Sequence, residues 1–254
     1  MKKSKIIIPA LAMLVMSTAA TVTGTVAWFT VNKTVTAKGM TVKAKADSSL
    51  VIKGSEDQKY TSVGTNNVSS DSMKPCTSYD GKNFGKLADN VLVESAGSSV
   101  ATWTGAEGAF AAANLEVASN GENTYFLNST YSIKSLGEAK AVYVKQINLN
   151  GTDALQPCIR VALTLESTTL VFNPGGGTNA AEGVGKYESG TWSLAVPTYT
   201  TVNTAGAKLA ELPKDTAKNV TVTIWFEGQD TVCYSDNAIN PADTTVDVLF
   251  TTEI

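Results

Sequence analysis

The segment Val220-Thr221-Val222-Thr223-Ile224-Trp225-Phe226-Glu227 decides the predicted fold of this chain. Its apolar side chains recur at every second position, which is the period of a β-strand with one buried face. β-Branched and aromatic residues favour extended backbone, so this is the strongest strand signal in the sequence. The predicted core face carries Val220, Val222, Ile224 and Phe226.

The same alternation recurs in other parts of the chain. In Ile159–Glu166 the apolar residues Ile159, Val161, Leu163 and Leu165 alternate with Arg160, Ala162, Thr164 and Glu166. The other predicted strands are Tyr125–Leu127, Ala141–Asn150, Thr168–Phe172, Trp192–Pro197 and Thr245–Thr251. Eight or more strands joined by turns predict an all-β fold, a two-sheet sandwich of the jelly-roll type with short helices and loop-rich insertions.

Polar and helical segments separate these strands. Residues 47–99 are rich in Ser, Asn, Gly and Asp and predict a loop-rich insertion at an edge or end of a sheet, with weak strand candidates at Leu50–Ile52 and Val91–Glu94. Gly105–Glu116 is the best helix candidate, and Thr204–Glu211 predicts a short helix or a connection.

The first 27 residues have the pattern of an export signal. Lys2, Lys3 and Lys5 form a basic start, an apolar run follows over residues 6–15, and small residues precede the predicted cut after Ala27. The alternative is a retained membrane anchor. The apolar run is shorter than the roughly 20 residues that span a bilayer, so we expect cleavage and a secreted, extracellular protein.

The junction Gly24-Thr25-Val26-Ala27-Trp28-Phe29-Thr30 carries an aromatic pair directly after the predicted cut. This run resembles the signal junction of the TasA/camelysin family of exported Gram-positive proteins. The segment Ile224–Asp230 followed by Cys233 is similar to the C-terminal part of TasA-like proteins. A structural role accounts for that segment, with a Glu-Gly turn that ends the strand and Trp225 covering the outer face of the sheet.

The resemblance implies a structural subunit of an extracellular filament, either a biofilm-matrix or a surface fibre. In such fibres the N-terminal strand of one subunit completes the sheet of its neighbour, a head-to-tail contact that propagates. Residues 28–46 are the N-terminal strand segment here, residues 47–254 form the jelly-roll domain, and Trp28–Lys38 is the candidate donor strand. The candidate anchors are Trp28, Phe29, Val31 and Val35. The expected partner is a second copy of the chain. Whether an accessory fibre protein starts assembly is left open by the sequence.

Charge and composition restrict the other functions. Without Lys2, Lys3 and Lys5, the 20 basic residues fall to 17 against 23 acidic residues, a net charge of −6. Arg160 is the only arginine, so no basic stripe binds nucleic acid, and an anionic membrane surface is not an expected partner.

The chain contains no histidine, which excludes histidine-based zinc proteases, Ser-His-Asp triads and Cys-His dyads. Paired carboxylates among Glu166, Glu227 and Asp230 are the remaining hydrolytic alternative, but nothing fixes their spacing. We expect no enzyme and no cofactor. Asp230, Asp236, Asn237 and Asp243 form either a calcium-binding loop over residues 230–243 or a plain acidic turn.

The three cysteines are an odd number, so at least one cannot pair within the chain. Cys158 precedes the strand Ile159–Glu166 and Cys233 follows the strand Val220–Glu227, so antiparallel pairing of those strands places both at the same end of a sheet. Two interpretations stay open. One is a Cys158–Cys233 disulfide, and the other is three buried free thiols, Cys76 among them, that act as small apolar residues.

A different class of function is a monomeric secreted adhesin or carbohydrate-binding β-sandwich module. Exposed aromatic side chains would then stack on sugar rings, although core packing accounts for the same residues. The candidates are Trp103, Tyr187, Trp192 and Tyr199.

Overall fold

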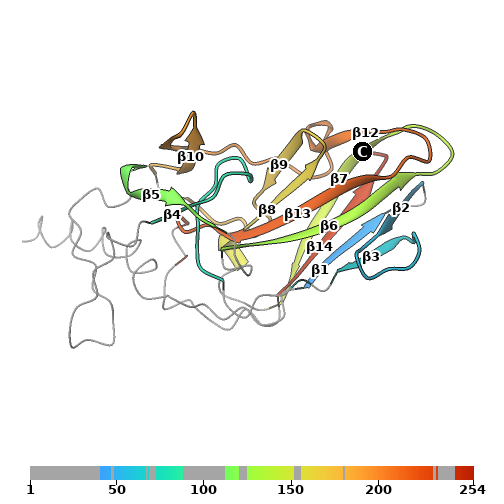
Figure 1. Ribbon diagram of the computed structural model, residues 1–254, viewed down its shortest axis with the longest axis horizontal. Helices are drawn as coiled ribbons and strands as arrows, with labels where there is room; N and C mark the ends of the chain where they lie inside the picture. Colours follow the sequence, from blue (N-terminus) through green and yellow to red (C-terminus); the bar gives the residue numbers. More distant parts are fainter. Residues whose placement is uncertain are drawn as a thin grey trace, which may run out of the picture.

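The computed structural model describes residues 41–46, 49–66, 68, 73–87, 112–119, 125–151, 156–179, 181–230, 233 and 244–254. These residues form an all-β fold in which two five-stranded sheets pack face to face (Figure 1). The predicted all-β, sandwich-like fold is therefore confirmed. The predicted signal, residues 1–27, and the donor anchors Trp28, Phe29, Val31 and Val35 lie outside the described residues.

The first sheet, here called the β13 sheet, is antiparallel throughout and is built around the strand that the sequence marks most strongly. Its order is β2 (Leu50–Lys53), β6 (Phe126–Ser135), β13 (Lys218–Phe226), β8 (Ile159–Leu165) and β9 (Thr168–Phe172). β13 pairs with β6 on one side and with β8 on the other. Both of its faces are buried from Val222 to Phe226, because the main core packs on one face and a second cluster packs on the other.

The second sheet, here called the β14 sheet, has a parallel pair at its centre. Its order is β12 (Lys208–Leu212), β7 (Lys140–Asn150), β14 (Thr245–Thr251), β1 (Thr41–Ala46) and β3 (Val63–Asn66). β1 pairs in parallel with β14 and antiparallel with β3. This parallel pair departs from the antiparallel pairing of a jelly roll, so the jelly-roll connectivity stays a prediction.

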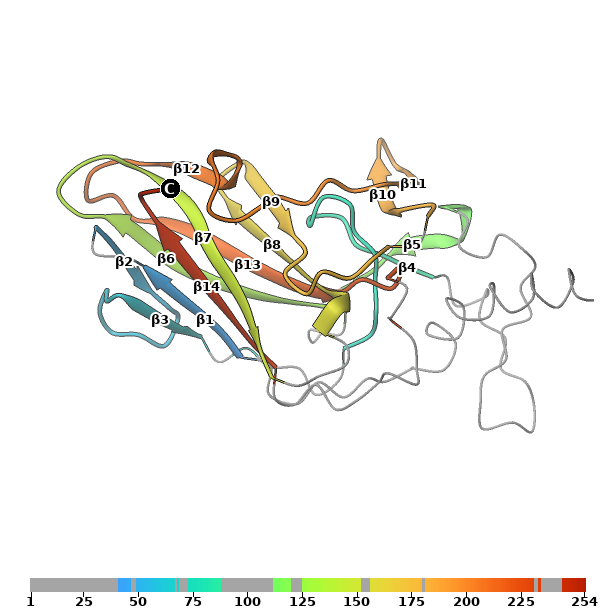
Figure 2. The same cartoon turned by 180° about the vertical axis from the view of Figure 1, so that it is seen from behind.

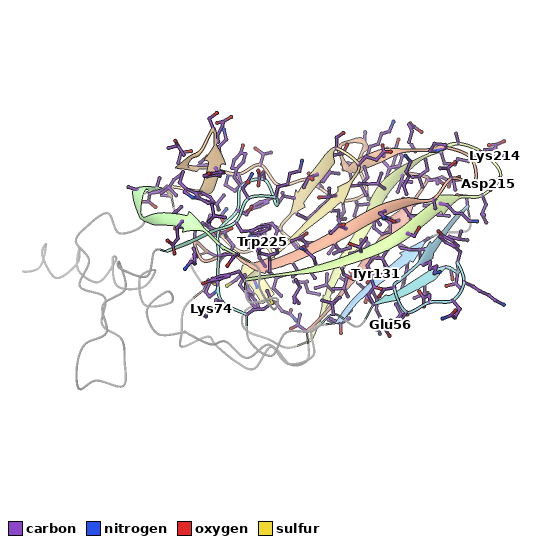
Figure 3. All side chains as sticks on the ribbon, in the orientation of Figure 1. Glu56, Lys74, Tyr131, Lys214, Asp215 and Trp225 are labelled. Atoms are coloured by element: carbon purple, nitrogen blue, oxygen red, sulfur yellow. The ribbon has the colours of Figure 1, made fainter. Side chains whose placement is uncertain are left out.

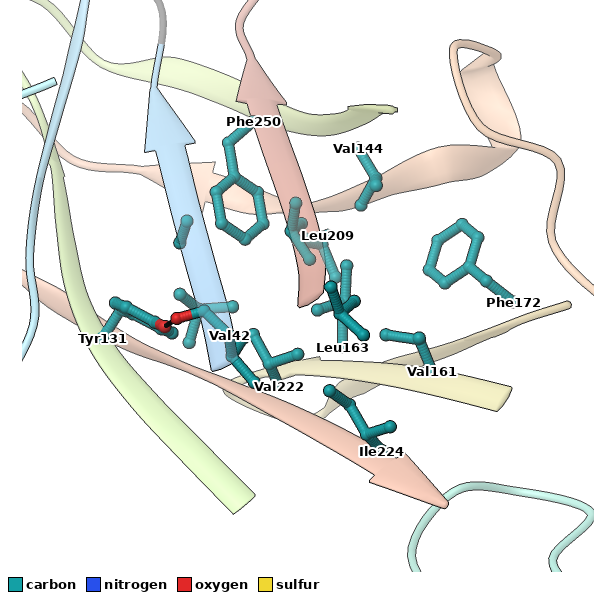
Figure 4. Packing of buried hydrophobic residues seen from close by; sticks show 14 of the residues in the cluster. Val42, Tyr131, Val144, Val161, Leu163, Phe172, Leu209, Val222, Ile224 and Phe250 are labelled. Atoms are coloured by element: carbon teal, nitrogen blue, oxygen red, sulfur yellow. Dashed lines mark hydrogen bonds between the residues drawn. The ribbon is translucent and has the colours of Figure 1, made fainter. Parts of the chain in front are cut away.

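The main core fills the space between the two sheets (Figure 4). The predicted core face of β13 is correct, since Val220, Val222, Ile224 and Phe226 are all buried there. A hydrogen bond also joins the sheets, because the Tyr131 Oη on β6 donates to the carbonyl oxygen of Val42 on β1 at 2.7 Å. Burial raises the pKa of Tyr131 to about 12.

A set of small elements, here called the end cap, lies at the end of the sandwich where β13 ends (Figure 2). It consists of the loop 73–84 and two two-stranded sheets, β4–β5 and β10–β11. The bounds are β4 (Gly85–Leu87), β5 (Leu115–Val117), β10 (Val184–Glu188) and β11 (Thr191–Ala195). Beneath the cap a second cluster packs on the outer face of the β13 sheet, made of Cys76, Phe84, Ala118, Ala162, Val171 and Trp225.

Several predicted boundaries were wrong. Thr204–Glu211 contains the 3₁₀ turn η5 (Ala205–Ala207), but its remainder belongs to the strand β12, where pairing with β7 overrides helix propensity. The predicted helix Gly105–Glu116 is described only at its end, which holds the 3₁₀ turn η2 (Ala112–Asn114) and the start of β5. Residues 50–66 lie at sheet edges, as expected, but they supply the edge strands β2 and β3 of the two main sheets and are not an insertion.

Other expectations hold in part. Leu50–Ile52 is a strand as predicted, whereas Val91–Glu94 lies outside the described residues. The predicted strand Tyr125–Leu127 is the first part of the longer β6, and β11 confirms most of Trp192–Pro197. In the described part of the chain, no helix is long and apolar enough to cross a membrane.

Candidate functional site

The most polar part of the interior lies under the end cap, where β8 begins and β13 ends. Arg160 is the second residue of β8 and stands opposite Trp225 of β13 in the register. Its Nη2 lies 2.6 Å from the Oδ2 of Asp230, and neither side chain is exposed. Asp230 belongs to the turn that follows β13, so the ion pair ties this turn to the outer face of the sheet.

The remaining donors of the Arg160 guanidinium also find partners. Nη1 donates to the carbonyl oxygen of Pro157 at 2.7 Å, Nε donates to the Tyr199 hydroxyl at 3.0 Å, and Nη2 donates to the Asn179 side chain at 3.1 Å. Burial lowers the pKa of Arg160, but the neighbouring Tyr199, Glu227 and Asp230 more than offset that effect, so the net pKa lies above its ordinary value. The guanidinium therefore stays charged.

Tyr199 and Asn179 join two further segments to this group. The Asn179 amide donates to the Tyr199 hydroxyl at 2.9 Å, and the hydroxyl donates back to Asn179 Oδ1 at 3.1 Å. Asn179 also forms a backbone bridge with Asp230. Burial raises the pKa of Tyr199, against the effect of the Arg160 charge, so the phenol remains neutral at ordinary pH.

Glu227 is the buried carboxylate at the end of β13. Its Oε2 accepts hydrogen bonds from Trp225 Nε1 at 3.1 Å and from the backbone N–H of Ser78 at 3.2 Å, and its Oε1 accepts one from Gln229 N at 3.2 Å. Burial raises the pKa of Glu227 above its ordinary value, while the bonds from Thr77, Trp225 and Ser78 and the Arg160 charge oppose the shift. Glu227 thereby joins β13, its turn and the end cap.

These five residues, Arg160, Asn179, Tyr199, Glu227 and Asp230, are called the Arg160 cluster below. Every member is engaged by another group of the chain, and four separate segments meet in it. Their contacts are those of a structural clamp, because buried charges with satisfied hydrogen bonds hold backbone segments in place. The expected structural role of Ile224–Asp230 agrees with this geometry, and Trp225 covers the outer face under the end cap (Figure 3).

The three carboxylates considered for glycoside hydrolysis do not converge. Glu166 lies in the turn between β8 and β9 and is ion-paired with Lys218 at 2.7 Å, at the opposite end of β8 from Arg160. Glu227 and Asp230 are buried in the Arg160 cluster. These three residues therefore do not form a pair of carboxylates that face a common cleft.

The acidic loop considered for calcium is described only at its start. Asp230 is ion-paired with Arg160, whereas Asp236, Asn237 and Asp243 lie outside the described residues. Within the described part of the chain, no three Cys, Asp or Glu side chains are grouped closely enough to hold a metal ion.

The aromatic residues considered for sugar stacking mostly pack within the protein. Tyr187 and Trp192 are cross-strand neighbours in the β10–β11 hairpin with ring centroids 4.9 Å apart. The Trp192 ring also lies over Gly85, where it leaves no space for a Cβ, and it lies close to Gly185. Tyr199 belongs to the Arg160 cluster, and Trp103 lies outside the described residues.

The outer edge of β9 is a partly open strand edge, with the segment 198–202 beside it. From described segments other than β8, it accepts one backbone hydrogen bond, from Thr200 N to Val171 O at 2.8 Å. Two hollows lie along this edge, of about 310 Å³ beside Tyr79, Lys82 and Thr169 and about 410 Å³ beside Ile147 and Phe172. Asn173 lines the larger hollow, and its Oδ1 is buried with no hydrogen-bond partner among the described residues.

Sequence reasoning missed the Arg160 cluster as a unit. It placed Arg160 on the outer face of its strand, which is correct, but it did not pair it with Asp230. The available signal was a single arginine in an otherwise apolar strand, because a charge at such a position needs a partner. The partner is 70 residues away in sequence, so no local pattern could identify it.

Comparison of the chain with known protein families, with curated proteins and with solved structures gives no match.

Proposed function

We propose that this protein is the structural subunit of an extracellular bacterial filament, in which the N-terminal segment Trp28–Lys38 of one copy adds as a strand to the sheet of the next. The proposal rests on the resemblance of the signal junction to the TasA/camelysin family and on the position of β1. β1 follows the donor segment after Gly39 and Met40. It lies between β14 and β3, as the fourth of the five strands of its sheet.

The pairing of β1 with a strand on each side is the observation that carries the proposal. Val42 and Ala44 are fully buried, and β1 pairs along its length with β14, so the chain is held firmly from Thr41 onward. The 13 residues from Trp28 to Met40 can extend at most about 45 Å from this anchor. That length is sufficient to reach a neighbouring subunit while the donor stays attached to a rigid domain.

The edge of β9 supplies a suitable acceptor. Strand addition needs free backbone groups and pockets for alternate side chains. Among the described segments other than β8, only Thr200 forms a backbone hydrogen bond with β9, at Val171. The two hollows lie along this outer edge. Phe172, Ile147 and Val202 give the larger hollow an apolar wall that suits an aromatic or branched donor side chain.

Donor and acceptor are different parts of the subunit, so the contact is head-to-tail and open-ended. A contact of this kind extends into a fibre rather than closing as a dimer. The Arg160 cluster and the end cap hold neighbouring segments of the β13 sheet together, which suits a subunit that must stay folded when the fibre is under tension. No catalytic activity is part of this proposal.

Electron microscopy of purified residues 28–254 and 36–254 tests the proposal. We expect fibres from the first protein and discrete particles from the second. A peptide of residues 28–38 added in trans should raise the thermal stability of residues 36–254, whereas a scrambled peptide should not. Fibres of normal appearance from residues 36–254 would refute strand donation, and a discrete 28–254 that binds a glycan would favour the adhesin alternative.

A further inference from the structure

Two of the three cysteines are attached to opposite ends of one turn. The carbonyl oxygen of Cys158 accepts a hydrogen bond from Glu227 N at 2.9 Å, and Cys233 N donates to the carbonyl oxygen of Asp230 at 3.0 Å. Asp230 N in turn donates to Glu227 O at 3.0 Å, which closes the turn. The backbone therefore brings residues 158 and 233 together, as expected for the ends of the adjacent strands β8 and β13.

The side chains of these two cysteines also belong to one cluster. Both are buried in the core between the two main sheets, and the Cys158 thiol is one of the groups that raise the pKa of the Cys233 thiol. All three cysteines are free thiols in the structure. Two thiols in one buried cluster, on backbone segments that the same turn holds together, can form a disulfide with little movement of the backbone.

Cys76 is close to the same turn along the backbone but faces the other way. Its N–H donates to Phe226 O at 3.1 Å and its carbonyl accepts from Gly228 N at 2.9 Å. Its side chain, however, belongs to the cluster on the outer face of the β13 sheet, where Sγ donates to the carbonyl oxygen of Tyr125 at 3.4 Å. The end of β13 thus lies between Cys76 and the other two thiols.

We propose that Cys158 and Cys233 form an intramolecular disulfide under oxidising conditions and that Cys76 is the thiol left over. Two S–H bonds break and one S–S bond forms. The two electrons and two protons pass to the disulfide of an exchange partner, either a low-molecular-weight disulfide or a thiol–disulfide oxidoreductase, which is reduced to two thiols. The link fixes the turn after β13 to the start of β8, directly beside the Arg160 cluster.

The bond has to form before the core closes. Thiol exchange proceeds through the thiolate, and burial, followed by the contact with Cys158, raises the pKa of the Cys233 thiol well above its ordinary value. Both side chains are at most 2 % exposed. An oxidant therefore reacts during folding or after the turn opens, and the folded, reduced protein reacts slowly.

Refolding of the full chain in a buffer of reduced and oxidised glutathione tests the pairing. After free thiols are blocked, non-reducing peptide mapping should find a Cys158–Cys233 link in most molecules and a blocked Cys76. The variant Cys76→Ala should give the same link. Links from Cys76 to either partner at comparable yield, or three blocked cysteines after oxidative refolding, would overturn the assignment.

The decisive outcome of a second measurement uses the wild-type chain alone, and two variants serve as controls. Addition of a reductant to the oxidised chain should lower its melting temperature, and the same drop should occur in Cys76→Ala. The double variant Cys158→Ala/Cys233→Ala should melt at the same temperature with and without reductant. An unchanged melting temperature of the oxidised wild-type chain on reduction would contradict a bond between these two positions.

Discussion

Arg160 and Asp230 form a fully buried ion pair, with Nη2 and Oδ2 2.6 Å apart, between the start of β8 and the turn after β13. The pair lies at the meeting point of the end cap and the β13 sheet. Because the interior has a low dielectric constant, each charge depends on the other, and loss of one partner leaves an isolated charge in the protein.

Replacement of Asp230 by Ala should therefore destabilise the protein strongly. We expect the free energy of unfolding to fall by about 3–5 kcal/mol in chemical denaturation, the range for breaking a buried pair. Lys218→Ala is the control, because it breaks a half-exposed pair with Glu166 and should cost less than about 1 kcal/mol. Equal losses in the two variants would show that the buried pair contributes no more than a surface pair.

Two adjacent glycines test whether the space around this pair is as tight as the structure indicates. A Cβ at Gly177 would overlap the Asp230 carboxylate and the carbonyl of Pro157, whereas a Cβ at Gly176 would meet no atom within 4 Å. We expect Gly177→Ala to cost about 1–3 kcal/mol or more through overpacking. Gly176→Ala should cost about 1–2 kcal/mol, from the positive φ of 72° alone.

The diagnostic readout for these two variants is the Arg160 cluster itself. Gly177→Ala should change the chemical shift of the Arg160 Nε–H, which is bonded to Tyr199, while Gly176→Ala should leave it unchanged. Equal stability and equal spectra for the two variants would contradict the predicted overlap.

Glu227 should give the protein a specific pH dependence. Burial raises its pKa in the folded state above the ordinary value of about 4.5, so the folded state binds the proton more readily than the unfolded state. The contribution of Glu227 to stability is then largest below pH 4.5 and falls as the pH rises through the folded-state pKa.

Denaturant unfolding between pH 4 and pH 8 checks this sign. The free energy of unfolding of the wild-type protein, relative to that of Glu227→Gln, should be highest at low pH. This difference should decrease as the pH rises. Glu182→Gln, at an exposed position, is the control and should run parallel to the wild type. A wild-type advantage that grows with pH would mean that the hydrogen bonds to Glu227 outweigh its burial.

The hydrogen bond between Tyr131 and Val42 should stabilise the packing of the two sheets against each other. Tyr131→Phe removes the donor at 2.7 Å and leaves a buried carbonyl without it, so we expect a loss of about 1–2 kcal/mol in thermal or chemical unfolding. Tyr60→Phe removes a half-buried hydrogen bond to Ser132 and should change the free energy of unfolding by less than about 0.5 kcal/mol. Identical effects would mean that the bond between the sheets adds nothing beyond a surface bond.

The donor-strand proposal predicts a dependence on side-chain face. In an extended segment Val31 and Val35 share one face, and Thr34 lies on the other. Val31→Lys or Val35→Lys should abolish or strongly slow fibre growth measured by light scattering, because a charge enters an apolar hollow. Thr34→Lys adds the same charge on the opposite face and should assemble at nearly the wild-type rate. Equal rates for all three variants would contradict the assigned anchors.

Much of the sheet structure could be predicted from the sequence because strand periodicity is local. β13 and β8 show an alternating apolar pattern whose period fixes which side chains face the core, and the structure confirms those faces. The predictions were wrong where pairing overrides local preference. β12 reads as a helix or connection when taken alone, and it becomes a strand because β7 offers an unpaired edge.

The sequence by itself determined the alternating core faces, the absence of histidine chemistry and the odd number of cysteines. Only the tertiary structure decided that Arg160 pairs with Asp230, that β1 lies parallel to β14, and that Cys76 is on the opposite side of the sheet from Cys158 and Cys233. The physical reason is the separation in sequence of the residues that determine each feature. Side-chain alternation is set by neighbouring residues, whereas charge pairing, strand order and thiol proximity depend on contacts between segments that lie far apart in the chain.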